Sequence, residues 1–151
     1  MKENCGLKGR YEISLISADT GHLLQLIKFD NCLTVIHRDM RCALLLGTTS
    51  GYTLNDLSIA AFAFGDGANP AQANNTALQH EMYRKAVTKK ALSAINTVQS
   101  ICAISNTECN FTIREIGVYS STGKLLSRAN CNIEKNSNIV MNVTRYDVIN
   151  I

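Results

Sequence analysis

The sequence predicts a mainly β protein of the α+β type, an antiparallel β-sandwich or barrel-like domain with one or two short helices. Apolar and polar residues alternate with the period of a strand near the N-terminus, and short apolar runs separated by turn residues fill the second half. A length of 151 residues with 46% apolar content suits one folded domain. Residues 1–10 are polar and contain glycine, so we expect an N-terminal arm ahead of a single β-rich domain over 11–151.

A β-hairpin is predicted directly after the arm. Tyr11, Ile13 and Leu15 alternate with polar residues, which is the period of a half-buried strand. Asp19-Thr20-Gly21 is typical of a turn, and a second apolar run follows over 22–30. The two runs are therefore expected to pair.

The apolar period then lengthens, which predicts a helix over about 33–46. Its inward face is expected to hold Leu33, Ile36, Met40, Ala43 and Leu44. Asn31 and Thr34 are both possible N-caps, and Gly47 lies just past the expected end.

The middle of the chain is expected to form a buried strand, a loop and a second helix. Residues 57–64 are apolar on both faces, as in a central strand covered on both sides, and Gly65-Asp66-Gly67 ends it. An Asn-rich loop of small residues follows over 68–75. Thr76-Ala77-Leu78-Gln79 has the pattern of a capping box, which predicts a short helix over 77–85.

The rest of the chain is expected to form strands at 87–95, 98–105, 111–120, 125–133 and 139–150. In the strand over 111–120, Arg114 and Glu115 point to opposite faces, so burial of either face places a charge among apolar neighbours. A buried charge costs several kcal/mol unless it is paired. If Glu115 is buried, Arg84 is its candidate partner; the alternative is an edge strand with both charges in water.

Charge and motif content argue against several classes of function. A net charge of +3, from 15 basic and 12 acidic residues, is too small to indicate a nucleic-acid partner. The longest apolar run is far shorter than the ~20 residues of a membrane helix. No export signal is visible, so we expect the chain to be made and kept in the cytosol. No nucleophile motif, P-loop or metal-spaced histidine is present, so we predict no catalytic residues, metal or cofactor.

Six cysteines are present, at Cys5, Cys32, Cys42, Cys102, Cys109 and Cys131. None of them is in C-x-x-C spacing, so a zinc site is not indicated. Two interpretations stay open. The thiols are buried as small hydrophobic groups, or some of them oxidise to intermolecular disulfides after leaving a reducing compartment.

Several motifs follow one another in a specific order. Asn31-Cys32-Leu33-Thr34 begins the expected helix, Ala63-Phe64-Gly65-Asp66-Gly67 ends the central strand, and 76–84 has the form Thr-x-Leu-x-x-Glu-x-x-Arg. Residues 110–119 contain Ile-Arg-Glu-Ile-Gly-Val-Tyr, and 120–128 continue with Gly-Lys-Leu-Leu-Ser-Arg at their end. This order resembles small phage structural proteins and the N-terminal anchor domains of phage tail fibres, over nearly the whole chain.

The resemblance implies a non-enzymatic structural component of a tailed-bacteriophage virion, made in the host cytoplasm. It implies a tail, baseplate or collar adaptor that anchors fibres or neighbouring subunits, with other phage structural proteins as partners and a homo-oligomer or ring as its form. Fibre proteins continue into a long fibre and this sequence stops at Ile151, so a stand-alone adaptor is expected. The alternative is a receptor- or glycan-binding module at the tail tip. The candidate interface residues are Asp66, Asn69, Pro70, Asn74 and Asn75.

Overall fold

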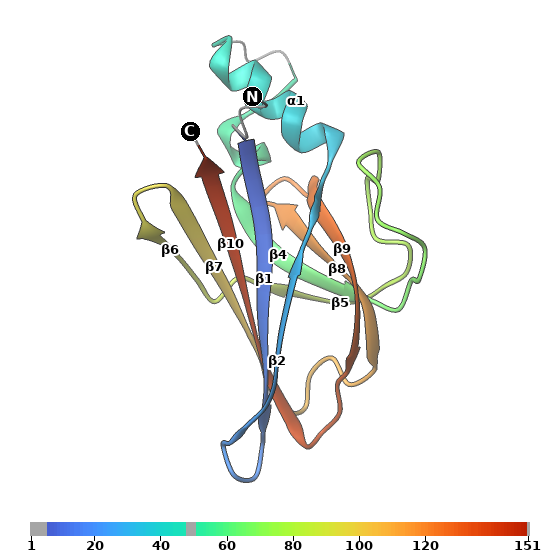
Figure 1. The fold of residues 1–151 in the computed structure, drawn as a ribbon. Helices are drawn as coiled ribbons and strands as arrows, with labels where there is room; N and C mark the ends of the chain where they lie inside the picture. The colour runs from blue at the N-terminus through green and yellow to red at the C-terminus, as the bar shows by residue number, and fades with distance from the viewer. Residues whose placement is uncertain (1–5, 48–50, 151) are drawn as a thin grey trace, which may run out of the picture. The chain divides into compact units, whose positions relative to one another are not determined.

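All strand pairs in the computed structural model, which describes residues 6–47 and 51–150, are antiparallel and form two sheets of five strands (Figure 1). Strands make up 55% and helices 10% of the structure, which confirms the predicted mainly β class and is consistent with a β-sandwich. The chain divides into two compact units, each with one sheet. Unit 1 consists of the residues up to Asn31, Val87–Asn110 and those from Lys135 onward, and unit 2 of Cys32–Ala86 and Phe111–Glu134.

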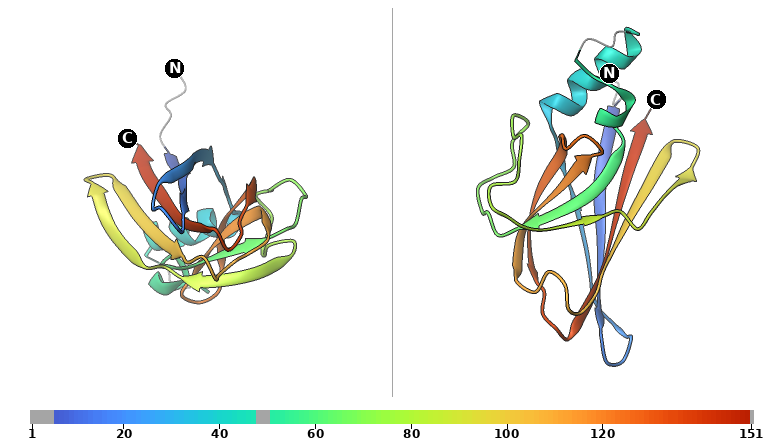
Figure 2. Two further views of the ribbon diagram at one scale, coloured as in Figure 1. Left: turned by 90° about the horizontal axis from the view of Figure 1, so that it is seen from below. Right: turned by 180° about the vertical axis from the view of Figure 1, so that it is seen from behind.

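The sheet of unit 1 has the strand order β2-β1-β10-β7-β6. Its strands are β1 (Gly6–Ser17), β2 (Leu23–Asp30), β6 (Lys89–Ala94), β7 (Thr97–Ile104) and β10 (Ile139–Asn150). The long strands β1 and β10 lie side by side in the middle of this sheet, and β2 and β6 form its edges (Figure 2). Tyr11, Ile13 and Leu15 are buried as their alternation predicts, and Gly21 supplies the positive φ of 71° that the hairpin turn requires. The predicted hairpin is confirmed.

The sheet of unit 2 has the strand order β3-β9-β8-β4-β5. Its strands are β3 (Cys32–Leu33), β4 (Ile59–Gly65), β5 (Glu81–Ala86), β8 (Thr112–Ser120) and β9 (Leu125–Glu134), and its helices are α1 (Val35–Leu45) and the short 3-10 helix η1 (Leu54–Asp56). Strand β4 lies between β5 and β8, so its prediction as an interior strand is confirmed. Phe62, Phe64, Ile116 and Val118 are fully buried.

Helix α1 begins at the second of the two predicted N-caps. The hydroxyl of Thr34 accepts a hydrogen bond from the backbone N–H of His37 at 3.2 Å and donates one to the carbonyl of Leu125 at 2.6 Å. The cap therefore satisfies a free N–H of the first turn and ties the helix to β9. Leu33 lies ahead of the helix in β3, whereas Met40 is fully buried on the inward face as predicted.

Two predictions of local structure are wrong. The segment expected to form a helix over 77–85 is extended and ends in β5. The backbone N–H groups of Leu78, Gln79 and His80 donate to side chains of β8 instead of to a helix cap at Thr76.

The second prediction that differs from the structure is the N-terminal arm over 1–10. Residues 6–10 belong to β1 and pair with β10, while residues 1–5 lie outside the described ranges. The single domain over 11–151 stays a prediction.

Candidate functional site

A buried glutamate of β8 organises the loop between β4 and β5. Glu115 is fully buried. Its Oε1 accepts hydrogen bonds from the backbone N–H of Gly67 at 3.2 Å and of His80 at 2.7 Å. Its Oε2 accepts from the backbone N–H of Gln79 at 2.9 Å and from Nε of Arg128 at 2.8 Å. Both carboxylate oxygens are thus occupied, and both ends of the loop over 66–80 are attached to one side chain.

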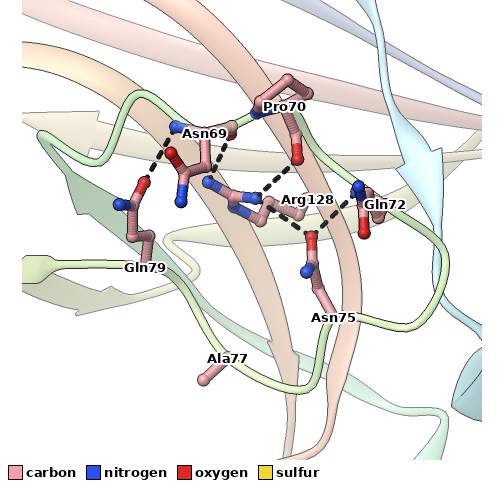
Figure 3. Close-up of a pocket in the computed structure, with 7 residues that line it drawn as sticks. All are labelled: Asn69, Pro70, Gln72, Asn75, Ala77, Gln79 and Arg128. Atoms are coloured by element: carbon pink, nitrogen blue, oxygen red, sulfur yellow. Dashed lines mark hydrogen bonds between the residues drawn. The ribbon is translucent and has the colours of Figure 1, made fainter.

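Arg128 of β9 holds the far part of the same loop. Its Nη1 donates to Oδ1 of Asn75 at 3.0 Å and to the carbonyl of Pro70 at 3.3 Å, and its Nη2 donates to the carbonyl of Asn69 at 2.9 Å (Figure 3). The residue is 2% exposed. A buried charge needs partners for its hydrogen-bonding groups as well as a counter-ion. The loop carbonyls supply the former and Glu115 the latter.

The pair that forms differs from the predicted one. Glu115 is buried beside a cation, but that cation is Arg128; the predicted partner Arg84 instead makes a bidentate pair with Glu81, at 2.7 Å for each hydrogen bond. The guanidinium of Arg84 also lies 3.8 Å from the ring centroid of Tyr119. The hydrogen bond with Glu81 raises the pKa of Arg84 further above its usual value. The Arg84 side chain is 41% exposed, so its pair with Glu81 is in contact with solvent, whereas the pair of Glu115 and Arg128 is buried.

Register explains why Arg128 was missed. Glu115 stands opposite Asn130 on β9, and Arg128 lies two residues before Asn130, on the same face of the sheet. Diagonal neighbours of this kind are within reach of long side chains. The sequence showed both strands but not the pairing between them, and that pairing selects the partner.

Two glycines allow the loop to approach the buried carboxylate. A Cβ atom added at Gly67 would collide with Oε1 of Glu115 and with the side chain of Gln79, and one added at Gly65 would collide with the carbonyl of His80. The Gly65-Asp66-Gly67 motif therefore serves close packing of backbone against Glu115, and it is more than a turn signal.

Gly67→Ala is expected to lower the free energy of unfolding by about 1–3 kcal/mol, because the added methyl group must displace the carboxylate from its backbone donors. Urea titration followed by circular dichroism measures the loss. Gly123→Ala is a useful contrast, because no atom lies near an added Cβ there and only the positive φ of 82° resists the change. An unchanged free energy of unfolding in Gly67→Ala, with unchanged hydrogen-exchange protection of the loop amides, would contradict the expectation.

The loop over 66–80 and Arg128 line an open pocket of about 370 Å³, and Figure 3 shows the residues that line it. It is lined by Asn69, Pro70, Gln72, Asn75, Ala77, Gln79 and Arg128. Three of the predicted interface residues, Asn69, Pro70 and Asn75, are thus brought together here. The other two are Asn74, which is exposed on the loop, and Asp66, whose Oδ1 lies 2.5 Å from Nδ1 of His80. Their role as an interface stays a prediction.

Unit 1 contains a second buried ion pair, which was not predicted from the sequence. Nε of Arg145 donates to Oδ2 of Asp147 at 2.8 Å, and its Nη2 donates to Oδ1 at 2.6 Å. Arg145 is fully buried and its guanidinium carbon lies 5.9 Å from the ring centroid of Tyr11. Both residues belong to β10 at spacing i,i+2, so a strand periodicity alone would have placed them on one face.

The cysteines differ widely in environment. Cys5 lies outside the described residues, Cys102 and Cys109 are buried, and Cys42 is exposed. Cys32, Cys42 and Cys131 are free thiols. Burial raises the pKa of Cys131 to about 12. Disulfides between chains stay a prediction, and Cys42 offers the most accessible sulfur among the described cysteines.

Thiol reactivity is expected to follow this order. Iodoacetamide at pH 8 should modify Cys42 quickly and Cys131 slowly, because a thiol with a pKa of about 12 holds only about one part in ten thousand as the reactive thiolate. Peptide mass spectrometry after short labelling times measures both rates in one sample. Equal rates in the native protein would contradict the raised pKa of Cys131, and equal rates in urea are the control.

Within residues 6–47 and 51–150, no three His, Cys, Asp or Glu side chains gather closely enough to hold a metal ion. No helix in these ranges has the length and apolar character needed to cross a membrane.

Comparison with known proteins identifies one family. The family model described as "Phage tail-collar fibre protein, N-terminal" matches residues 48–150. No curated protein and no solved structure gives a significant match. The matched region contains Glu115, Arg128 and the loop that they hold, and it confirms the resemblance to N-terminal domains of phage tail fibres. The chain therefore belongs to the family of N-terminal domains of phage tail-collar fibre proteins and has a structural role in a phage tail.

Proposed function

We propose that the chain is a tail, baseplate or collar adaptor that anchors fibres or neighbouring subunits as a homo-oligomer, by docking and without catalytic turnover. Family membership implies a component of the virion whose partners are other phage structural proteins. The proposal adds the manner of binding. The loop over 66–80 is the contact surface, and the predicted interface residues Asn69, Pro70 and Asn74 present its exposed part.

The observation that carries the proposal is the use made of the buried ion pair. Glu115 and Arg128 direct their hydrogen bonds to the loop, through three backbone N–H groups, two backbone carbonyls and the side chain of Asn75. The pair is thereby engaged in fixing the shape of an exposed segment. A loop that is already ordered loses little conformational entropy when a partner binds, which favours stable docking.

The exposed part of the loop suits contact with another protein. Asn69, Gln72 and Asn74 are exposed and uncharged, and Pro70 restricts the backbone between them. Amide side chains donate and accept hydrogen bonds, so they complement the polar rim of a protein interface without the desolvation cost of a charge.

Asn74→Arg tests the proposal, because it adds a long charged side chain at an exposed position that lies outside the hydrogen bonds of Glu115 and Arg128 with the loop. Ser137→Arg, in an exposed turn of unit 1, is the matched control. Virions are purified from phage that encode each variant, and their protein content is measured by quantitative mass spectrometry. We expect Asn74→Arg to reduce the copy number of the chain or of an attached fibre protein, and Ser137→Arg to leave both unchanged.

The opposite results are equally clear. Absence of the wild-type chain from virions would overturn the adaptor role. Normal virion content with Asn74→Arg, together with loss of glycan-array binding by the purified variant, would favour the alternative of a glycan-binding module. The amide-lined pocket under the loop is the feature that such a ligand would use.

A further inference from the structure

We propose that the pocket lined by the loop over 66–80 and Arg128 binds a carboxylate, supplied by an acidic side chain of a partner protein in the virion. The inference rests on the proposed function, since it names the chemical group by which the partner engages the loop. Its own evidence is the direction of the hydrogen-bond donors in the pocket, and it concerns unit 2 alone.

The amide oxygens of Asn75 and Gln79 are used by the loop itself. Oδ1 of Asn75 accepts from the backbone N–H of Gln72 at 2.9 Å and from Nη1 of Arg128 at 3.0 Å. Oε1 of Gln79 accepts from the backbone N–H of Asn69 at 2.8 Å (Figure 3). A backbone N–H and a guanidinium only donate, so these contacts fix which branch of each amide carries the oxygen. The other branch is the NH2 group, a donor.

Donors that line the pocket are left unused by the protein. Among the described residues, the side-chain nitrogens of Asn75 and Gln79 donate no hydrogen bond, and both residues line the pocket. Arg128 has five N–H groups. One is bonded to Glu115 and three to acceptors of the loop, so one N–H on Nη2 has no acceptor within residues 6–47 and 51–150. Buried polar groups are nearly always satisfied, so this N–H requires an acceptor in the pocket.

A carboxylate matches this set of donors. It only accepts hydrogen bonds, and its two oxygens offer about four lone-pair positions. Hydrogen bonds to an ionised acceptor are roughly twice as strong as those between neutral groups. The residues that line the pocket are Asn, Gln, Pro, Ala and Arg, so a carboxylate meets no acidic side chain on the lining. A cation would instead face a row of donors.

The charge of Glu115 favours a carboxylate that is attached to a docked protein. Glu115 lies 2.8 Å from Nε of Arg128 and balances its charge, so the pocket offers hydrogen bonds without net positive charge. A small carboxylate in solution should therefore bind weakly. An acidic side chain on a partner already docked at the loop is present at high effective concentration and loses little further translational freedom. Asn69 and Pro70 belong both to the pocket and to the proposed contact surface, which makes a partner protein its source.

Sodium acetate is the probe for the isolated chain. The side-chain amide signals of Asn75 and Gln79 in heteronuclear NMR spectra should shift saturably with acetate, and not with sodium chloride at the same ionic strength. Asn75→Asp and Gln79→Glu each keep the oxygen that accepts from the loop and replace the donor with a second acceptor. Each should weaken acetate binding by about tenfold or more, because a hydrogen bond to a charged group is lost.

Gln72→Glu is the matched control, since it adds the same charge at an exposed residue of the same pocket and leaves both amide donors in place. At physiological salt it should change acetate binding by no more than about twofold, because exposed charges are screened. Circular dichroism confirms that each variant is folded. Equal losses in Gln72→Glu and Asn75→Asp would show general repulsion in place of donor loss. That result, or the absence of acetate shifts in the wild type, would overturn the proposal.

Virion content separates this inference from the proposed function. Asn75→Asp should reduce the copy number of the chain or of an attached fibre protein, as Asn74→Arg does. Depletion with Asn74→Arg but normal content with Asn75→Asp contradicts the carboxylate contact and leaves the adaptor role intact. Normal content with Asn75→Asp, together with loss of binding to acidic glycans on an array, would assign the pocket to a sugar carboxylate and overturn the protein partner. Absence of the wild-type chain from virions contradicts the adaptor role, whatever the acetate result.

Discussion

Arg128→Met is expected to lower the free energy of unfolding by about 3–5 kcal/mol, the range for removing one partner of a buried ion pair. The methionine fills much of the same volume, so the loss comes mainly from electrostatics and hydrogen bonding. Glu115 would remain fully buried without its counter-ion, and the carbonyls of Asn69 and Pro70 would lose their donors. Urea denaturation followed by far-ultraviolet circular dichroism measures the change.

Arg84→Met is the matched control, since it removes the same side chain from an ion pair of the same sheet. Arg84 is 41% exposed, so solvent screens its pair with Glu81, and its stacking on Tyr119 adds a modest term. We expect a loss of about 1–2 kcal/mol from both contacts together. Equal losses from the two substitutions would contradict the assignment of Arg128 as the central cation of the site.

The double variant Glu115→Gln with Arg128→Met separates the ion pair from its effect on the loop. Removing both charges avoids an unpaired buried carboxylate, so the double variant should be more stable than Arg128→Met alone. The loop should nevertheless be less ordered, because a neutral amide is a weaker acceptor than a carboxylate for the N–H groups of Gln79 and His80. Hydrogen exchange of these amides reports loop order separately from global stability.

Local signals account for the parts of the fold that were predicted from the sequence. Alternation around Ile13, a turn at Gly21 and a cap at Thr34 each involve residues close together in the chain, and each is confirmed. The signals that predict them lie within the element or between sequence neighbours, although β1 also pairs with β10 and Thr34 also donates to Leu125. A reading of periodicity and turn residues is therefore sufficient for them.

Non-local contacts account for the parts that were missed. The capping-box pattern at Thr76 is a valid local signal, but the N–H groups of Gln79 and His80 find a stronger acceptor in Glu115, which follows them by 36 and 35 residues. A buried carboxylate outweighs a local helical turn. The choice of Arg128 over Arg84 as its partner likewise depends on the β8–β9 register, which no local pattern encodes.

Asp147→Ala is expected to have a comparable effect in unit 1. It leaves Arg145 fully buried and without the carboxylate that accepts two of its hydrogen bonds, which should lower the free energy of unfolding by about 3–5 kcal/mol. Asp30→Ala, at an exposed position of β2 in the same unit, should change it by no more than about 0.5 kcal/mol.

The spread of this destabilisation tests whether 11–151 is a single domain. The chain passes between the units after Asn31, Ala86, Asn110 and Glu134, so neither unit is a continuous segment. The unit 1 sheet joins β1 to β10 and β10 to β7, and segments of unit 2 separate these strands in sequence. Formation of the unit 1 sheet therefore constrains the ends of the segments that make up unit 2. We expect the two units to unfold in one cooperative transition. In Asp147→Ala, the backbone amides of β8 and of β10 should then lose protection against hydrogen exchange to the same extent. A loss confined to β10 would mean that the two units unfold separately.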